Sequence, residues 1–132
     1  MLQRMAHRDN YDIEVDLAKN RIYFYPKGTW NKISDVPDYI DDLKACAKKL
    51  RPGFDIISDG THFAAPTQEI SGLILEGTTL MREMGQKRAA IIVTTSILKI
   101  ILEKHKGEME QEKMETRYFD NMTKAEEWLD ER

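Results

Sequence analysis

Several features that would place a protein in a special class are scarce in this sequence. There is one cysteine, Cys46, so an intramolecular disulfide is excluded. No stretch approaches the roughly 20 apolar residues that a membrane-spanning helix needs, and residues 1–10 lack the apolar core of a signal peptide. The 20 basic and 23 acidic side chains nearly cancel, so the charge excess typical of nucleic-acid binding is missing. We therefore expect a cytoplasmic protein with no membrane span and no nucleic-acid partner.

Histidine is also scarce, and its spacing argues against a metal site. The three histidines, His7, His62 and His105, lie far apart in the chain, and none has a close-spaced ligand partner of the kind found in zinc sites. The sequence also lacks a glycine-rich loop of the kind that binds phosphate groups. We therefore expect no metal and no cofactor, and we assign no catalytic residue.

The sequence does contain enough apolar material for one folded domain. Of its 132 residues, 41% are hydrophobic and 33% are charged, and a chain of this length buries roughly two thirds of its unfolded surface on folding. We expect residues 11–132 to form a single domain, preceded by an N-terminal extension over residues 1–10.

The hydrophobic pattern alternates between the periods of strands and helices. Strands are expected at residues 11–16, 21–28, 54–58, 88–95 and 116–119, and helices at residues 34–53, 67–84, 96–105 and 123–132. The first two strands predict a hairpin, because Asn20 tolerates the backbone of a tight turn. The strand at 88–95 is apolar on both faces, which is typical of a sheet centre covered on both sides. The fold class is therefore α/β, with a mixed, mostly parallel sheet of about five strands and four helices.

Two of the expected helices carry residues with a specific interpretation. Cys46 lies beside the apolar stripe of the first helix, which predicts a buried structural thiol rather than a nucleophile. Thr123 and Glu126 have the spacing of a capping box, in which each side chain satisfies a backbone donor at the start of the last helix.

The third helix has more apolar residues than one face needs. We expect Ser96 to cap it and Ile97, Ile100 and Ile101 to face the sheet. Three other apolar positions, one of them on the second helix, are surplus to the sheet-facing stripes: Leu75, Leu98 and Leu102. Burial under residues 106–116, a contact with a homodimer or protein partner, and a cleft for an apolar ligand are all consistent with this surplus.

Three stretches resemble one bacterial family. They are "LRPGFDIISDGTHFAAP", "GQKRAAIIV" and "RYFDNMTKAEEWLDE". Together with the order of elements they are similar to the SpoIIAA-like (STAS/SEC14-type) proteins, whose STAS fold also occurs in anti-sigma-factor antagonists. The resemblance extends from Tyr11 to Glu131 and implies a STAS fold. It rests on packing and turn residues rather than on catalytic motifs.

The same resemblance implies a possible phosphorylation site at the start of the second helix. In phosphorylatable STAS proteins a serine there is modified by a partner kinase, and the added charge repels a partner that had packed against the hydroxyl. "EISGL" matches that motif by letters and gives Ser71, with Glu69 as the acidic residue, whereas the helix start itself gives Thr67. The alternative is that Thr67 is a helix N-cap and Ser71 a small packing residue.

A second candidate site follows the strand at residues 54–58. Asp59, Thr61 and His62 lie just beyond the carboxyl end of that strand, where ligands bind in open α/β sheets. A carboxylate and an imidazole could serve acid–base chemistry or orient a ligand. The alternative is that Asp59 stabilises the turn at Gly60 and that His62 is merely exposed.

From these features we expect a regulatory protein-interaction module of the STAS type without enzymatic activity, with a protein partner or a homodimer. The alternative function is binding of a small, lipid-like apolar ligand in a closed cavity lined by the second and third helices. An enzyme would require Asp59 and His62 to converge on one cleft.

Overall fold

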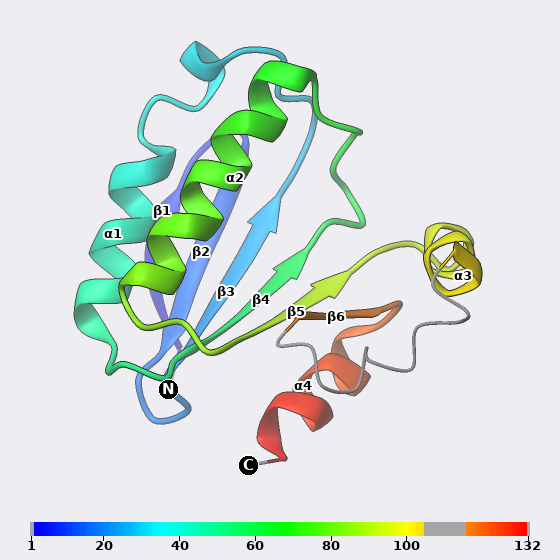
Figure 1. Ribbon diagram of the computed structural model, residues 1–132. Helices are drawn as coiled ribbons and strands as arrows, with labels where there is room; N and C mark the ends of the chain where they lie inside the picture. The colour runs from blue at the N-terminus through cyan, green and yellow to red at the C-terminus, as the bar shows by residue number, and fades with distance from the viewer. Residues whose placement is uncertain (1, 105–115, 132) are drawn as a thin grey trace.

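The computed structural model describes residues 2–104 and 116–131, in which a six-stranded sheet carries helices on both faces (Figure 1). The strands are β1 (Leu2–His7), β2 (Tyr11–Asp16), β3 (Arg21–Pro26), β4 (Asp55–Asp59), β5 (Arg88–Ile92) and β6 (Thr116–Phe119). The helices are α1 (Tyr39–Lys49), α2 (Gln68–Glu83), α3 (Thr95–Lys104) and α4 (Met122–Asp130), with a short 3-10 helix, η1 (Ile33–Asp35), before α1. Among the described residues, no helix combines the length and the apolar character needed to cross a bilayer.

The six strands lie side by side in chain order. β1, β2 and β3 pair in antiparallel fashion, whereas β3 through β6 pair in parallel. The expected hairpin is confirmed as β2 and β3, and Asn20 in its turn has a φ of +58°. The α/β class, the mixed sheet and the four expected helices are thus confirmed within the described residues.

The sheet has one more strand than the expected five, because the expected N-terminal extension contains β1. This strand lies at the edge of the sheet and pairs only with β2, with a register shift between Arg4 and Ala6. Of its six residues only Ala6 is buried. An edge strand that buries so little leaves no alternating apolar pattern in the sequence.

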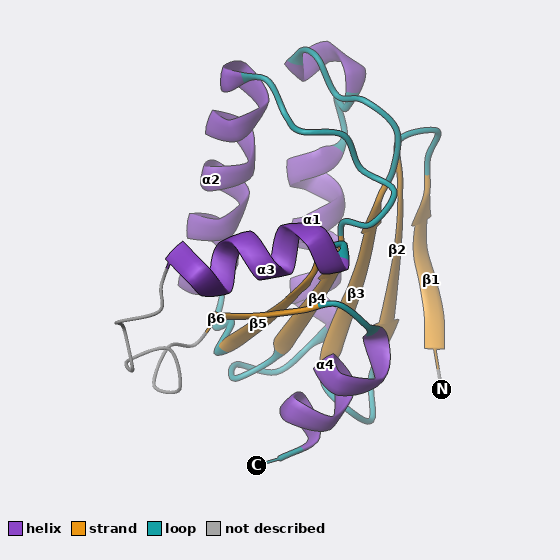
Figure 2. Cartoon of the chain, turned by 90° about the vertical axis from the view of Figure 1, so that its right-hand side faces the viewer, coloured by secondary structure: helices purple, strands orange, loops and turns teal. Residues whose placement is uncertain are grey.

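Helices α1 and α2 cover one face of the sheet and α4 packs on the other (Figures 1 and 2). The expected inward stripes of α1 and α2 are confirmed by the buried residues Tyr39, Leu43, Cys46 and Ala47 on α1 and Ile70, Leu73, Gly77 and Met81 on α2. The main core lies between these two helices and the sheet, and a smaller core lies beneath α4. The two helices approach closely at Gly77, where an added Cβ would lie 2.9 Å from the hydroxyl oxygen of Tyr39.

The expectation that residues 88–95 form the sheet centre is wrong. β5 is next to the edge strand β6, and the centre is formed by β3 and β4. On one face of β5, Ala90 and Ile92 are buried in the core beneath α4. On the other face, Ala89 and Ile91 are only half-buried. The two-sided apolar pattern is therefore real, but one of its faces has incomplete cover.

A cluster of charged side chains holds α4 against the sheet. Arg21 on β3 is 1% exposed and donates hydrogen bonds to Glu126 at 3.1 Å and to Asp130 at 3.0 Å, both on α4. Asp55 on β4, also 1% exposed, lies 3.8 Å from Arg21. Arg88 on β5 donates to backbone carbonyl groups at the carboxyl end of α4. At the amino ends of β3, β4 and β5, neighbouring strands thus present a positive, a negative and a positive side chain to α4.

The expected capping box of the last helix is wrong. Asn121 is the N-cap of α4, and its side-chain oxygen accepts a hydrogen bond from the backbone of Lys124 at 2.9 Å. Glu126 instead accepts hydrogen bonds from Arg21 and Tyr23. Burial alone would raise the pKa of Glu126, but these hydrogen bonds outweigh burial and hold its pKa below the ordinary value.

The expected orientation of the third helix is also wrong. α3 lies across the β6 end of the sheet (Figure 2). Of the three isoleucines expected to face the sheet, Ile97 and Ile100 are 46% and 62% exposed, and Ile101 is half-buried, as is Leu98. Thr94, rather than Ser96, caps the helix, because its hydroxyl oxygen accepts from the backbone of Ile97 at 3.3 Å. Apolar residues occupy most of the circumference of α3, so periodicity could not identify its buried face.

Candidate functional site

An apolar cavity of about 400 Å³ lies between α2 and one face of β3 to β6. Alternate residues of neighbouring strands point to the same face of a sheet, and two such rows form the cavity floor. One row comprises Phe24, Ser58, Ile91 and Tyr118, and the other comprises Ile56, Ala89 and Thr116. The incompletely covered face of β5 is therefore part of this floor.

The roof of the cavity is one side of α2. Its lining residues recur at the spacing of a single helix face: Ile74, Gly77, Thr78, Met81 and Arg82. Met81 is 1% exposed and lies at the inner side, whereas Thr78 and Arg82 are exposed. Tyr39 and Leu43 of α1 form a side wall. The cavity is thus buried towards α1 and open towards solvent between α2 and β6, where Tyr118 is 38% exposed.

One end of the cavity is formed by aromatic rings at the carboxyl ends of β3 and β4. The loops after these strands pair through Gly28, whose backbone donates to His62 at 3.0 Å and accepts from Ala64 at 2.9 Å. This pairing places the ring of Phe63 edge-on to Trp30, with 4.9 Å between centroids. Both rings line the cavity, and edge-to-face packing of this kind restricts their movement.

The opposite end of the cavity is polar. Arg82, Gln86 and Thr116 lie at the carboxyl end of α2 and at the start of β6. The Arg82 guanidinium donates to the hydroxyl of Thr116 at 3.3 Å, and the Gln86 amide donates to the carbonyl of Arg88 at 3.4 Å. The cavity therefore has an aromatic end and a hydrogen-bonding end, separated by aliphatic side chains.

The two predicted phosphorylation candidates differ in their surroundings. Thr67 is the N-cap of α2, since its hydroxyl oxygen accepts from the backbone of Ile70 at 3.3 Å and also donates to the carbonyl of Asn31 at 2.8 Å. The N-cap interpretation of Thr67 is confirmed. Ser71 lies one turn into α2 and is exposed. Glu69, the acidic residue of the matched motif, accepts from the backbone of Ile33 at 2.7 Å.

Asp59, Thr61 and His62 do not come together as an acid–base pair. A carboxylate oxygen of Asp59 accepts from both the backbone and the hydroxyl of Thr61, at 3.1 and 2.7 Å, which stabilises the turn at Gly60. His62 is exposed, and its ring makes no hydrogen bond to any described residue. Of this segment, Gly60 and Phe63 line the cavity. Asp59 and Thr61 thus shape a loop beside the cavity rather than contribute groups to it.

Two of the three surplus leucines have side chains that the structure describes, and these differ in burial. Leu75 is 66% exposed on α2, and Leu98 is half-buried on α3. The side chain of Leu102 lies outside the described part of the chain, as does most of the segment 106–116 that could cover it. The alternative function predicted a closed cavity lined by the second and third helices. The cavity is instead open to solvent on one side, and among the described residues it is lined by α2 and not by α3.

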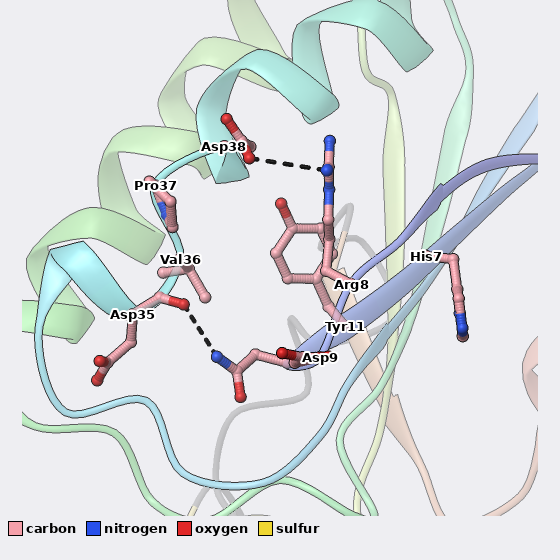
Figure 3. Close-up of a pocket in the computed structure, with 9 residues that line it drawn as sticks. His7, Arg8, Asp9, Tyr11, Asp35, Val36, Pro37 and Asp38 are labelled. Carbon is pink, nitrogen blue, oxygen red and sulfur yellow. Dashed lines mark hydrogen bonds and ion pairs between the residues drawn. The ribbon is translucent and has the colours of Figure 1, made fainter.

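A second pocket, of about 320 Å³, is polar and lies between the β1–β2 connection and residues 35–38 (Figure 3). Arg8 lies 3.7 Å from Asp38 and donates two hydrogen bonds of 3.0 Å to Asp42 on α1. The Tyr11 hydroxyl donates to the same Asp42 at 2.5 Å, and burial together with this hydrogen bond raises the pKa of Tyr11. Because these groups bind one another, we interpret this pocket as a structural connection between the edge of the sheet and α1.

The remaining candidate groups have structural roles. Cys46 is fully buried on α1, and burial, with a smaller effect of Asp42, raises the pKa of its thiol to about 12. The structural role expected for this thiol is confirmed. Within the described residues, no three histidine, cysteine, aspartate or glutamate side chains lie close enough together to hold a metal ion.

Comparison with known proteins adds no relative: no family model, no curated protein and no solved structure matches this chain. The apolar cavity is therefore the candidate site on its geometry alone. The sequence interpretation missed most of its residues, because they come from six elements, and the apolar ones among them also fit a core pattern. One signal was present: the strand around Ala89 is apolar on both faces, and in the structure its Ala89 and Ile91 face is only half-buried.

Proposed function

We propose that this protein binds a small, mostly apolar molecule in the cavity between α2 and the β3–β6 face. Ligand sites typically have volumes of roughly 300–1,000 Å³ and are lined by apolar and aromatic side chains with a few polar groups, and this cavity has about 400 Å³ and such a lining. The observation that carries the proposal is the half-buried apolar floor at Ala89 and Ile91, which opens to solvent beside Tyr118.

Burial of apolar surface is the driving force for such binding. Each 100 Å² of apolar surface removed from water contributes about 2.5 kcal/mol, and a cavity already lined by packed side chains needs little rearrangement to accept an occupant. Trp30 and Phe63 are held by ring packing and by the paired loops. The site is therefore largely preformed.

Tryptophan fluorescence provides a direct test. The chain has two tryptophans: Trp30 lines the cavity, and Trp128 packs on the far side of the sheet in the core beneath α4. In a Trp128→Phe background, we expect a terminally brominated octanol to quench Trp30 in a saturable manner, because bromine quenches indole on contact. The same compound should leave Trp128 unaffected in a Trp30→Phe background.

A blocking variant and a matched control complete this test. Ala89→Phe places a ring in the cavity floor and should abolish saturable quenching, whereas Ala45→Phe adds the same ring to the exposed side of α1 and should leave it unchanged. Circular dichroism would verify that both variants are folded. Quenching that does not saturate, or that is the same in the two folded variants, would refute the proposal.

A second candidate is the STAS-type regulatory interaction, and it is supported by the exposed face of α2. Ser71 and Leu75 are both exposed and lie one turn apart, so a phosphate on Ser71 would add charge beside a 66% exposed apolar side chain. Phosphopeptide mapping of the protein isolated from its own host tests this proposal. Phosphate on Ser71 would support it, and an unmodified Ser71 under all growth conditions would remove it.

A further inference from the structure

The ionised side chain that lines the cavity carries a positive charge. Among the described lining residues, Arg82 is the one ionised side chain, and no carboxylate lines the cavity. Side chains three and four positions away are the nearest neighbours on the surface of a helix, and within α2 these are Thr78 and Thr79 for Arg82, both neutral. Arg82 lies in the last turn of α2, where the helix dipole favours a cation, and no carboxylate of that helix forms an ion pair with it in the described structure.

The partner that Arg82 does have is also neutral. Its guanidinium carries five N–H donors and donates one hydrogen bond, at 3.3 Å, to the hydroxyl of Thr116 on β6. Within the described part of the chain, no ion pair joins Arg82 to a carboxylate. Donors of a planar guanidinium suit a carboxylate, which accepts two parallel hydrogen bonds from it.

The two ends of the cavity differ in chemistry, so they favour one orientation of a bound molecule. Its aromatic end, at Trp30 and Phe63, lies at the carboxyl ends of the strands. Arg82 and Thr116 lie at the opposite end, where β6 begins. Aliphatic side chains such as Ile91 line the space between these ends. A molecule with an apolar body and one acidic end matches this arrangement in both polarity and orientation.

We propose that the ligand is an amphipathic monoanion, with a carboxylate bound by Arg82 and an apolar tail directed towards Trp30 and Phe63. This inference rests on the proposed apolar ligand site and adds the chemical class of the ligand. Arg82 is the specificity-determining residue, because it distinguishes an acid from a neutral molecule with the same tail.

Calorimetric titration with sodium octanoate and octanol, which share one tail, tests this inference. We expect the wild-type protein to bind octanoate about 10-fold more tightly than octanol, since hydrogen bonds to charged groups are stronger than those between neutral groups. Arg82→Gln should remove this preference by weakening octanoate alone, and Arg82→Lys should retain part of it. Arg51→Gln, at an exposed arginine outside the cavity, should behave as the wild type.

The outcomes separate the inference from the proposed function. Equal affinities of the wild-type protein for octanoate and octanol, or a preference that survives in Arg82→Gln, would overturn the inference and leave the apolar site in place. If neither compound binds, both the inference and the apolar site fail. Octanol binding in all variants, with the octanoate preference confined to those that keep a cation at position 82, supports both.

Discussion

Replacing Arg21 with methionine tests what holds α4 on the sheet. Arg21 is 1% exposed on β3, and its guanidinium reaches Glu126 at 3.1 Å and Asp130 at 3.0 Å on α4. It also lies 3.8 Å from Asp55, which is 1% exposed. Methionine retains an apolar stem of similar length but removes the charge. Asp55 would then lose the cation of Arg21 and keep that of Arg88, 3.5 Å away.

The expected loss follows from the burial of each partner. Removing one member of a buried ion pair costs about 3–5 kcal/mol, mainly because the other charge remains buried. The carboxylates on α4 are screened by water, since Glu126 is 25% exposed and Asp130 is 51% exposed. Most of the loss therefore comes from Asp55, and we expect the free energy of unfolding to fall by about 3 kcal/mol, the lower end of that range.

Urea unfolding at neutral pH, followed by circular dichroism, measures this loss. Arg117→Met is the matched control, because Arg117 lies over the ring of Trp128 at 5.3 Å and should cost less than about 1 kcal/mol. Adding Asp55→Asn to Arg21→Met should recover about 1 kcal/mol or more, since it neutralises the charge left buried. A loss below about 1 kcal/mol for Arg21→Met, or no recovery in the double variant, would refute this reasoning.

Three further predictions concern single contacts. Gly77→Ala should lower the free energy of unfolding by about 1 kcal/mol, because the added Cβ would lie 2.9 Å from the Tyr39 hydroxyl oxygen and this overpacking outweighs the gain in helix propensity. In urea unfolding, this loss should be smaller in a Tyr39→Phe background. An equal loss in both backgrounds would contradict the contact. The pKa of Glu126 is held below 4.5, so the stability that its carboxylate contributes is present above that pH and is lost as the pH falls through the folded pKa. The difference in free energy of unfolding between the wild type and Glu126→Gln should therefore become smaller below about pH 4.5. A difference that stays constant down to about pH 3 would be inconsistent with the lowered pKa. Thr67→Ala should cost about 1 kcal/mol in thermal unfolding whereas Thr67→Ser should cost little, and equal losses would argue against the N-cap.

Elements with a characteristic turn residue, or with apolar residues along one face, were predictable from the sequence. The hairpin around Asn20 and the helices over the main core were found, because turn chemistry and a buried stripe leave a local signature. β1 was not found, because an edge strand in which only Ala6 is buried leaves almost no signature. The buried face of α3 could not be chosen, because apolar residues surround that helix.

The candidate site was less predictable than the fold. A cavity is the space left between elements, and no local pattern reports how completely one element covers another. Ala89 and Ile91 gave the nearest signal, but the same pattern also fits a central strand with full cover. The role that we propose for Arg82 depends on its placement opposite Thr116, 34 residues along the chain. Polar residues in loops, such as Asp59 and His62, attract attention in a sequence, but here Asp59 stabilises a turn and His62 is simply exposed.

The buried thiol of Cys46 gives the chain a built-in reporter of its own opening. It is the single cysteine of the sequence and is fully buried in the core between α1 and the sheet, so we expect a thiol reagent to react after α1 has separated from the sheet. The labelling rate therefore measures the free energy of that separation. Tyr39 and Leu43 on the same helix form a wall of the cavity, so an occupant should slow labelling in proportion to its affinity and concentration. Ligands without any colour or fluorescence could be ranked by this reaction alone.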